Sequence, residues 1–420
     1  PDQWGSDMYE FAVIWEWLSL AARWVHIITA IAWIGSSFYF IALDLGLQKG
    51  PGLSEGADGE EWQVHGGGFY HIQKYLVAPK RMPDHLTWFK YESYATWLSG
   101  FVLMAIIYYA GADIFLIDPT VADLTSGQAI LISIVSIGVG WVIYDRLCKS
   151  AFGEDNTRLM IFLYVVLVAM AWGYTQVFTG RAALVHLGAF TATIMSANVF
   201  FIIIPNQKIV VDDLINGRKP DPKFGRIAKQ RSTHNNYLTL PIIFLMLANH
   251  YPLAFATEYN WLIASLVFLM GVTIRHYFNS KHARSGDPIW TWLATTLLFI
   301  AIMWLSTLGP KSANEGKHAT MSAHEQRFAR AAHFEEVKEL VQGRCIMCHA
   351  QEPGYDGFIV APKNVKFETD AEIASQAREI YLHAGRSRAM PPPAVVRDGI
   401  ELSARERQLL VKWYEAAVKR

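Results

Sequence analysis

Long apolar segments fill the first 310 residues of the chain and constrain its fold more than any other feature. Eight of them are long enough to cross a bilayer as helices, because about 20 apolar residues match the hydrocarbon core. Lipid cannot hydrogen-bond to open backbone groups, so a helix is the expected structure for each. The eight segments cover roughly residues 12–43, 92–111, 127–147, 159–179, 182–204, 236–254, 259–278 and 288–308. The sequence therefore predicts an all-α, polytopic, eight-helix membrane domain.

Charged residues divide the chain into two parts of different composition. Residues 311–420 carry 32 Lys, Arg, Asp or Glu side chains, whereas the 310 residues before them carry 42. Soluble proteins are about 25% charged, so only the C-terminal part has a soluble composition. The net charge of the whole chain is zero, which gives no basic field for nucleic acid. We expect a transmembrane domain over residues 1–310 and a soluble domain over residues 311–420.

Lys and Arg residues predict the orientation of the membrane domain. Eighteen of them fall on one predicted side, and only Arg23 and Arg181 fall on the other. In membrane proteins the cytoplasmic loops carry the excess of positive charge. The crowded side comprises the segments 44–91, 145–158, 205–233 and 275–284. The N-terminus and the C-terminal domain are therefore expected on the periplasmic side of a bacterial inner membrane.

A Cys-x-x-Cys-His motif indicates the chemistry of the C-terminal domain. Cys345 and Cys348 have the spacing that attaches haem c, and the adjacent His349 would be the proximal iron ligand. A chance match or half of a zinc site would show the same residues. The segment before the motif has the apolar spacing of an amphipathic helix. Its apolar residues are Phe334, Val337, Leu340 and Val341.

The second iron ligand is expected some tens of residues after the motif. Met390 lies in an Arg-Ala-Met-Pro-Pro-Pro segment, whose prolines would stiffen a ligand loop. His383 is the rival ligand, and an open coordination position is the third alternative. Pro362 lies where a backbone carbonyl could orient the proximal histidine. With a final amphipathic helix predicted over residues 403–418, the domain resembles the small class I cytochromes c, whose His/Met ligation suits electron transfer.

Two histidines in the predicted spans are candidate ligands of a b-type haem. Ionisable groups inside a membrane are costly and often functional. His26 lies three residues after Arg23 on one helical face, and His186 opens the fifth span toward the same predicted side. His26 could instead bond a neighbouring helix while Arg23 reaches the surface. The sequence has no His-His dipeptide of the kind that haem–copper oxidases use for copper, which argues against an oxygen-reducing oxidase.

Polar residues gather at the predicted cytoplasmic ends of spans two, six and seven and in the first inner loop. Arginine and asparagine can pair with a planar, anionic, amide-rich molecule, and a carboxylate or imidazole can accept its protons. Interfacial anchoring would explain each of these residues singly. The candidate substrate-binding residues are Arg275, Asn235, Asn236 and His65, and the candidate proton acceptors are Glu92, His234 and His276.

Three landmarks are spread across the whole chain. They are Arg-Trp-Val-His-Ile-Ile in the first span, Trp-x-Val-His-Gly-Gly-Gly-Phe-Tyr in the first inner loop, and the terminal Cys-Ile-Met-Cys-His. With them the chain resembles the bacterial membrane-bound urate oxidases, the urate hydroxylase or PuuD family. The first span also resembles, more weakly, the HemJ-type membrane protoporphyrinogen oxidases, which hold a b haem through a histidine near the place of His26.

The first resemblance implies an eight-span domain, a cytochrome c domain and a role in purine catabolism. It implies oxidation of urate to 5-hydroxyisourate, with electrons passed to cytochrome c and no hydrogen peroxide formed. Electrons would cross through a b haem on His26 and His186 to haem c, and then to a soluble periplasmic acceptor. Two alternatives are a membrane haem dehydrogenase for quinol or another small reductant, and a non-catalytic electron-relay subunit.

Overall fold

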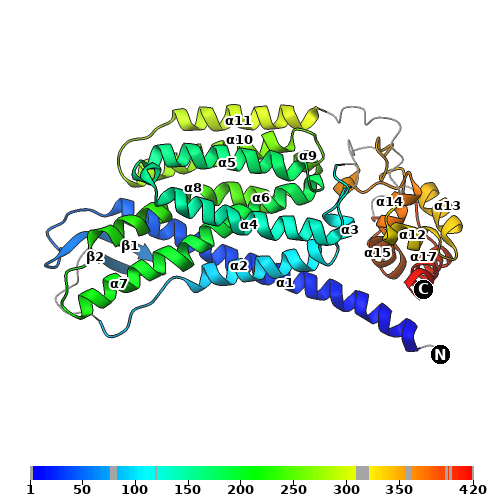
Figure 1. Ribbon diagram of the computed structural model, residues 1–420, viewed down its shortest axis with the longest axis horizontal. Coiled ribbons are helices and arrows are strands. Elements are labelled where there is room, and N and C mark those ends of the chain that lie inside the picture. The colour runs from blue at the N-terminus through cyan, green and yellow to red at the C-terminus, as the bar shows by residue number, and fades with distance from the viewer. Residues whose placement is uncertain are drawn as a thin grey trace.

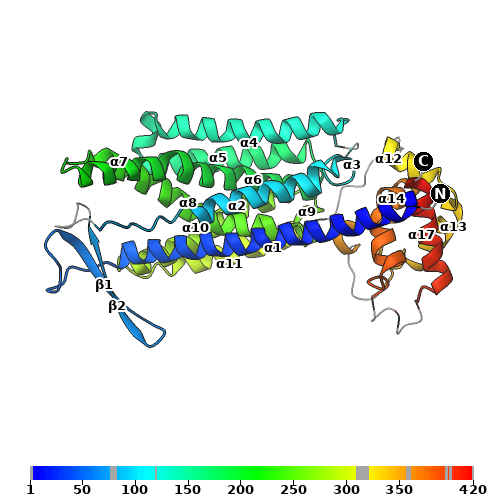
Figure 2. The same ribbon diagram turned by 90° about the horizontal axis from the view of Figure 1, so that it is seen from below.

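The computed structural model of the chain is almost entirely helical (Figure 1). It describes residues 3–75, 83–118, 121–308, 321–355, 361–392, 396 and 400–418. The predicted domain boundary at residues 310 and 311 lies outside these ranges, as do Lys80 and Arg81 of the crowded side. Two views at right angles show an elongated helical bundle with a small helical domain at one end (Figures 1 and 2).

Long helices that run side by side form the bundle (Figure 1). Its helical elements are α1 (Gln3–Gly46), α2 (Tyr91–Met104), η1 (Ala105–Tyr109), α3 (Ala112–Phe115), α4 (Ser126–Cys148), η2 (Ala151–Glu154), α5 (Asn156–Thr175), α6 (Gly180–Ala197), η3 (Asn198–Ile203), α7 (Ile204–Ile215), α8 (Pro222–Ala248), α9 (Pro252–Phe255), α10 (Asn260–His282) and α11 (Trp290–Thr307). Two of them, η1 and η3, are π-helical turns that continue α2 and α6.

Within the described residues, six helices are long and apolar enough to cross a membrane. They are α1, α4, α5, the continuous helix from α6 to α7, α10 and α11. The remaining predicted spans, 92–111 and 236–254, also fall on helices. However, α2 has only 14 residues before its π-helical turn, and α8 begins with the polar segment Pro222–Asn236. The six apolar helices are compatible with a membrane protein.

The predicted first inner loop contains a β-hairpin, so the expectation of an all-α fold is wrong for this segment. Strand β1 (Ala57–His65) pairs antiparallel with β2 (Gly68–Tyr75). Gly66 and Gly67 between them have φ of +59° and +80°, as a two-residue type I′ turn requires. Paired glycines between two such strands are the sequence signal of a hairpin. The hairpin lies at the end of the bundle away from the C-terminal domain, which is called the hairpin end (Figure 2).

Helix α6 is the centre of the bundle core and packs against α4, α5 and α8. Close packing around it depends on small residues at the contacts. A Cβ atom at Gly140 of α4 would overlap the ring of Phe190, which is fully buried in α6. A Cβ atom at Gly271 of α10 would lie 2.5 Å from Cδ of Pro241 in α8. These two glycines therefore set how closely α4, α8 and α10 approach their neighbours.

The C-terminal domain is a compact set of short helices. Its elements are α12 (Ala323–Ala329), α13 (Phe334–Arg344), η4 (Pro362–Asn364), α14 (Asp370–Ser375), α15 (Ala377–Ile380), η5 (Tyr381–Arg386) and α17 (Ala404–Val418). The helices predicted before the Cys-x-x-Cys-His motif and at the end of the chain are confirmed as α13 and α17. The buried rings of Phe334 and Trp413 join them at 6.0 Å, and the Ser403 hydroxyl caps α17 by accepting the Glu406 N–H.

Several contacts connect the C-terminal domain to the bundle. Arg378 forms a 3.1 Å ion pair with Glu16 near the start of α1, α17 packs against α1, and η4 packs against α9. The N-terminal part of α1 reaches toward this domain in both views (Figures 1 and 2). The end of the bundle that bears these contacts is called the module end.

Gly140→Ala is predicted to destabilise the bundle by about 1–3 kcal/mol, because the buried Phe190 ring has no free space to move into. Gly138→Ala on the same helix is the matched control, since a Cβ there meets nothing within 4 Å. Thermal unfolding of the detergent-solubilised variants measures the difference. Equal unfolding temperatures for the two variants would contradict the close packing of α4 on α6.

Candidate functional site

The Cys-x-x-Cys-His motif begins where α13 ends, and Cys345 and Cys348 are both free thiols. His349 donates its Nδ1 proton to the backbone carbonyl of Val365 at 2.8 Å. Burial lowers the pKa of His349 and so favours the neutral ring, although the Val365 bond acts in the opposite direction. Its Nε2 lone pair is then available to iron, the usual arrangement of a metal-binding histidine. The accepting carbonyl belongs to Val365, whereas the sequence pointed to Pro362 at the start of η4.

Met390 is held by its backbone. Its N–H donates to the carbonyl of His383 at 2.9 Å, and Arg407 of α17 donates to the Met390 carbonyl at 3.0 Å. The rival ligand His383 has its Nε2 engaged by Glu379 Oε2 at 3.1 Å. This hydrogen bond raises the pKa of His383, and because Nε2 donates its proton to the carboxylate, that nitrogen has no lone pair for iron. The contacts therefore favour Met390 over His383 as the second ligand.

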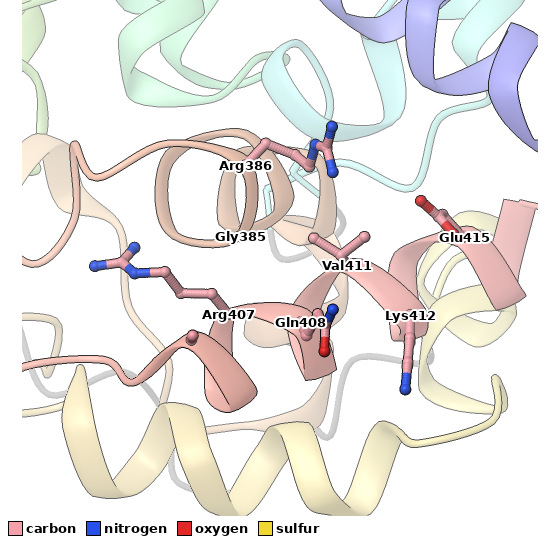
Figure 3. A pocket seen from close by; sticks show the side chains of 8 residues that line it. Gly385, Arg386, Arg407, Gln408, Val411, Lys412 and Glu415 are labelled. Carbon is pink, nitrogen blue, oxygen red and sulfur yellow. The ribbon is translucent and has the colours of Figure 1, made fainter.

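A groove of about 420 Å³ runs between the end of η5 and α17 (Figure 3). Its lining includes Arg386, Arg407, Lys412 and Glu415. No residue of the Cys-x-x-Cys-His motif lines it, so the groove is not the surface where the motif would attach a haem. Because Arg407 lines the groove and also bonds the Met390 carbonyl, the wall of the groove supports the Met390 loop.

Arg275 of α10 is the centre of a buried polar cluster toward the hairpin end. Its Nε donates to Asn236 Oδ1 at 3.3 Å, and its Nη2 donates to Asn279 Oδ1 at 3.0 Å. Asn279 also donates to Asn236 Oδ1 at 3.0 Å. The ring of Phe38 from α1 lies 4.1 Å from the guanidinium carbon. These four residues are called the Arg275 cluster.

The Arg275 cluster has more donors than acceptors. Arg275 is only 6% exposed, yet no carboxylate of the described residues forms an ion pair with it. The Asn236 Nδ2 group is also buried and lacks a partner in the same part of the chain. A buried charge without a counter-ion is costly, as is a buried amide without an acceptor. The cluster is therefore suited to a planar anion that supplies acceptor atoms.

A second polar group, also toward the hairpin end, pairs its buried arginine with a carboxylate, although the Arg231 Nε has no hydrogen-bond partner in the described residues. Arg231 of α8 is 1% exposed and donates to Asp145 Oδ1 of α4 at 2.8 Å and to Asn198 Oδ1 at 2.9 Å. Asn198, the first residue of η3, donates to the Tyr144 hydroxyl at 3.2 Å and to Asn235 Oδ1 at 3.1 Å. Because the arginine has its carboxylate, this group, called the Arg231 network, needs no external anion.

His234 completes the Arg231 network, because its Nδ1 lies 2.7 Å from the Tyr144 hydroxyl. This hydroxyl also accepts from Asn198 and can either donate to the imidazole or accept from it. His234 Nε2 is buried and has no partner among the side chains that the structure describes. The role of His234 as a proton acceptor stays a prediction.

Helix geometry separates the two polar groups. Consecutive side chains on a helix point about 100° apart, so neighbours in α8 face different helices. Asn235 points toward α6, where its Nδ2 donates to the Met195 carbonyl at 2.9 Å. Asn236 points toward α10 and joins Arg275. The structure therefore brings together Arg275 and Asn236 of the predicted site and places Asn235 and His234 in a separate network.

The other three predicted site residues lie apart from the Arg275 cluster. His276 follows Arg275 in α10, but its ring faces Trp290 of α11 at 6.0 Å. Glu92 is half-buried in the first turn of α2, and His65 is exposed at the tip of the hairpin. In the described part of the chain, no hydrogen bond joins these three side chains to the cluster.

His26 and His186 each have the tautomer of a metal ligand. His26 Nδ1 donates to the Thr96 carbonyl of α2 at 3.1 Å, and His186 Nδ1 donates to the Ala182 carbonyl at 2.8 Å. Both Nε2 atoms are left without a proton. Gly100 makes room for the His26 ring, since a Cβ atom there would lie 2.8 Å from His26 Cε1.

The two histidines contact α2 and its π-helical continuation at different positions. His26 contacts α2 at Thr96 and Gly100, whereas His186 packs on Tyr108 of η1. The rings of Tyr108, Tyr174 and Phe178 surround His186, with centroids 4.7–6.0 Å away. The pairing of His26 and His186 on one haem iron stays a prediction.

Sequence reasoning did not assign six residues of the two polar groups: Phe38, Tyr144, Asp145, Asn198, Arg231 and Asn279. Asp145 was detectable, because it is the only acid in the predicted span 127–147. Asn279 lies four residues after Arg275 and so shares its helical face. Arg231 was counted only as a loop charge that set the orientation. No local pattern marked Phe38 or Asn198, whose partners lie on distant helices.

The fold and the buried polar groups define a helical bundle that is compatible with a membrane protein and contains a candidate ligand-binding site. A family model described as "Urate oxidase N-terminal" matches residues 12–306, which cover the whole bundle. The chain therefore belongs to the urate oxidase N-terminal family, which indicates an oxidoreductase with a urate-related substrate. No curated protein and no solved structure shows significant similarity to the chain.

Replacing the two buried arginines is predicted to affect stability in opposite ways. Arg231→Leu breaks a buried ion pair and should cost about 3–5 kcal/mol. Arg275→Leu removes a charge that has no carboxylate among the described residues, so stability should be unchanged or higher. Thermal unfolding temperatures of the two purified variants provide the test. A loss of stability for Arg275→Leu as large as that for Arg231→Leu would show that the Arg275 cluster is purely structural.

Proposed function

We propose that the protein oxidises urate to 5-hydroxyisourate and delivers the electrons through a haem c to a soluble cytochrome c or another periplasmic acceptor, without forming hydrogen peroxide. The family match supports a urate-related oxidation. The observation that carries the assignment of a binding site is the buried Arg275 cluster. In the described residues its guanidinium has no carboxylate partner and its Asn236 Nδ2 group has no acceptor. Urate is a planar anion with carbonyl oxygens, so it would supply both the charge and the acceptors.

In the proposed reaction, water adds a hydroxyl group to C5 of urate while two electrons and two protons leave. Arg275 and Asn236 would hold the anion, and the Phe38 ring would fix the guanidinium from the side of α1. The proton acceptor is proposed to be Glu92, His234 or His276. Asn235 and His234 would support the site from the neighbouring network, and His65 would act from the hairpin tip.

The C-terminal domain is proposed to be a class I cytochrome c. The donor set fits a covalent haem: Cys345 and Cys348 are free thiols, His349 has an available Nε2, and Met390 is held in a braced loop. When bound, haem c accepts electrons one at a time. The packing of α13 on α17, around Phe334 and Trp413, supports the same assignment.

A b-type haem in the bundle is proposed on His26, whose Nδ1 bond to Thr96 and open Nε2 fit an iron ligand. His186 is proposed as the second ligand, because its Nδ1 bond to the Ala182 carbonyl leaves its Nε2 open in the same way. We assign no step of the reaction to this group.

The proposed topology has eight spans, with α2 and α8 completing the six apolar helices. The surplus of Lys and Arg on the crowded side supports a cytoplasmic hairpin end and a periplasmic module end. This places the C-terminal domain in the periplasm of a bacterial inner membrane, where haem c is attached.

Arg275→Gln should lower kcat/KM for urate by about 10- to 100-fold, because a charged hydrogen bond contributes about 1.5–3 kcal/mol. The assay is urate-dependent reduction of added cytochrome c under nitrogen. Arg158→Gln is the matched control, since Arg158 is exposed and pairs only with Asp155 on its own helix turn. An unchanged kcat/KM in Arg275→Gln would reject this urate site, and no reduction by the unaltered protein would reject the function.

His349→Ala should abolish electron delivery to external cytochrome c while leaving the bundle folded, because His349 lies in the separate C-terminal domain. A pyridine haemochrome spectrum checks the c-type haem, and the unfolding temperature checks the bundle. Full cytochrome c reduction by this variant would show that electrons leave by another route.

A further inference from the structure

A second group of buried donors lies at the module end of the bundle. Arg181 is the second residue of α6, and Arg23 lies on α1 three residues before His26. The Arg181 guanidinium lies beside the hydroxyl of Tyr108 in η1, and Arg23 is within electrostatic reach of the same hydroxyl. No carboxylate in the described ranges forms an ion pair with either arginine. The group is separate from the Arg275 cluster, because it lies at the module end of the bundle and the Arg275 cluster lies toward the hairpin end.

The donors of this group are unsatisfied. Tyr108 is 3% exposed, and its hydroxyl has no hydrogen-bond partner within the described residues. The Nε of Arg181 is likewise buried and has no hydrogen-bond partner there, although the Arg181 guanidinium interacts with the Tyr108 hydroxyl. The Phe115 ring lies 5.7 Å from the Arg181 guanidinium carbon and covers it on one side. Buried donors without acceptors are costly, so the site favours a ligand that brings anionic oxygen atoms.

The group also faces the proposed electron outlet. His250, after the end of α8, is within electrostatic reach of Arg23, Arg181 and Lys363 of η4. Two residues beyond Lys363, Val365 accepts the hydrogen bond from His349. A ligand held by the two arginines would therefore lie between the bundle and the loop that positions the proximal histidine.

We propose that Tyr108, Arg181 and Arg23 form a carboxylate-binding site at the module end of the bundle. One source of the carboxylate is a propionate of a haem on His26, because Arg23 lies one helical turn from His26 on the same face. The other source is a free carboxylic acid that enters between the bundle and the C-terminal domain. The first source rests on the proposed function, whereas the second does not.

The test compares Arg181→Gln and Tyr108→Phe with the unaltered full chain in lipid nanodiscs. Arg158→Gln is the matched control, because it removes an exposed arginine of α5 that has its own carboxylate. The first measurement is the ratio of b-type to c-type haem by pyridine haemochrome after dialysis. The second is the rise in unfolding temperature on adding succinate, with chloride at equal ionic strength as the reference.

If a haem propionate occupies the site, Arg181→Gln should retain b-type haem about tenfold more weakly than the unaltered protein. Tyr108→Phe should lose less b-type haem, and the c-type haem should be unchanged in both variants. If a free carboxylic acid occupies the site, succinate should raise the unfolding temperature of the unaltered protein and of Arg158→Gln but not that of Arg181→Gln. Identical haem ratios and identical succinate responses in all variants would overturn the proposal. If Arg181→Gln does not fold, the same two measurements on Tyr108→Phe provide the test, because this substitution removes one hydroxyl and keeps the ring. Failure of urate oxidation alone would leave the succinate result unaffected.

Discussion

The ion pair between Arg231 and Asp145 organises the polar interior of the bundle. Two charges that are almost fully buried can be tolerated only when they are paired and their remaining hydrogen bonds are made. Here the guanidinium also fixes Asn198, which in turn orients Tyr144 and Asn235. Three long helices, α4, α6 with its π-helical turn, and α8, are thereby tied together by side chains that cannot change partners independently. The π-helical turn begins at Asn198, inside this network, and such turns are frequent at functional sites.

Unlike Arg231, which pairs with Asp145, Arg275 has no counter-ion among the described residues. The same helix α8 contributes Asn235 to the first group and Asn236 to the second, so the two groups share a rigid support. A cluster that buries a positive charge without a counter-ion loses stability in the free protein and gains it when an anion binds. The Tyr108 hydroxyl beside Arg181, at the opposite end of the bundle, also lacks a hydrogen-bond partner in the described residues. The two proposed anion sites thus lie toward opposite ends of the bundle, and the second lies next to the C-terminal domain.

Sequence patterns predicted the features that depend on residues close together in the chain. The apolar segments located the long helices, and the Cys-x-x-Cys-His spacing located the free thiols next to α13. The hairpin was missed, although Gly66 and Gly67 between alternating residues indicate it, because the segment was treated as a connecting loop. The split of Asn235 and Asn236 between two sites depends on which helices pack on each face of α8. The residues of α2 and η1 that His26 and His186 contact depend on how the helices pack, and no sequence pattern contains that information.

The central claim is that urate bound in the bundle reduces the haem of the C-terminal domain. The most direct measurement is a reduced-minus-oxidised optical spectrum of the unaltered purified protein under nitrogen, with urate as the only reductant. The account predicts that the bands of reduced c-type haem appear as urate is consumed, with 5-hydroxyisourate as the product. A c-type haem that dithionite reduces and urate leaves oxidised would contradict it.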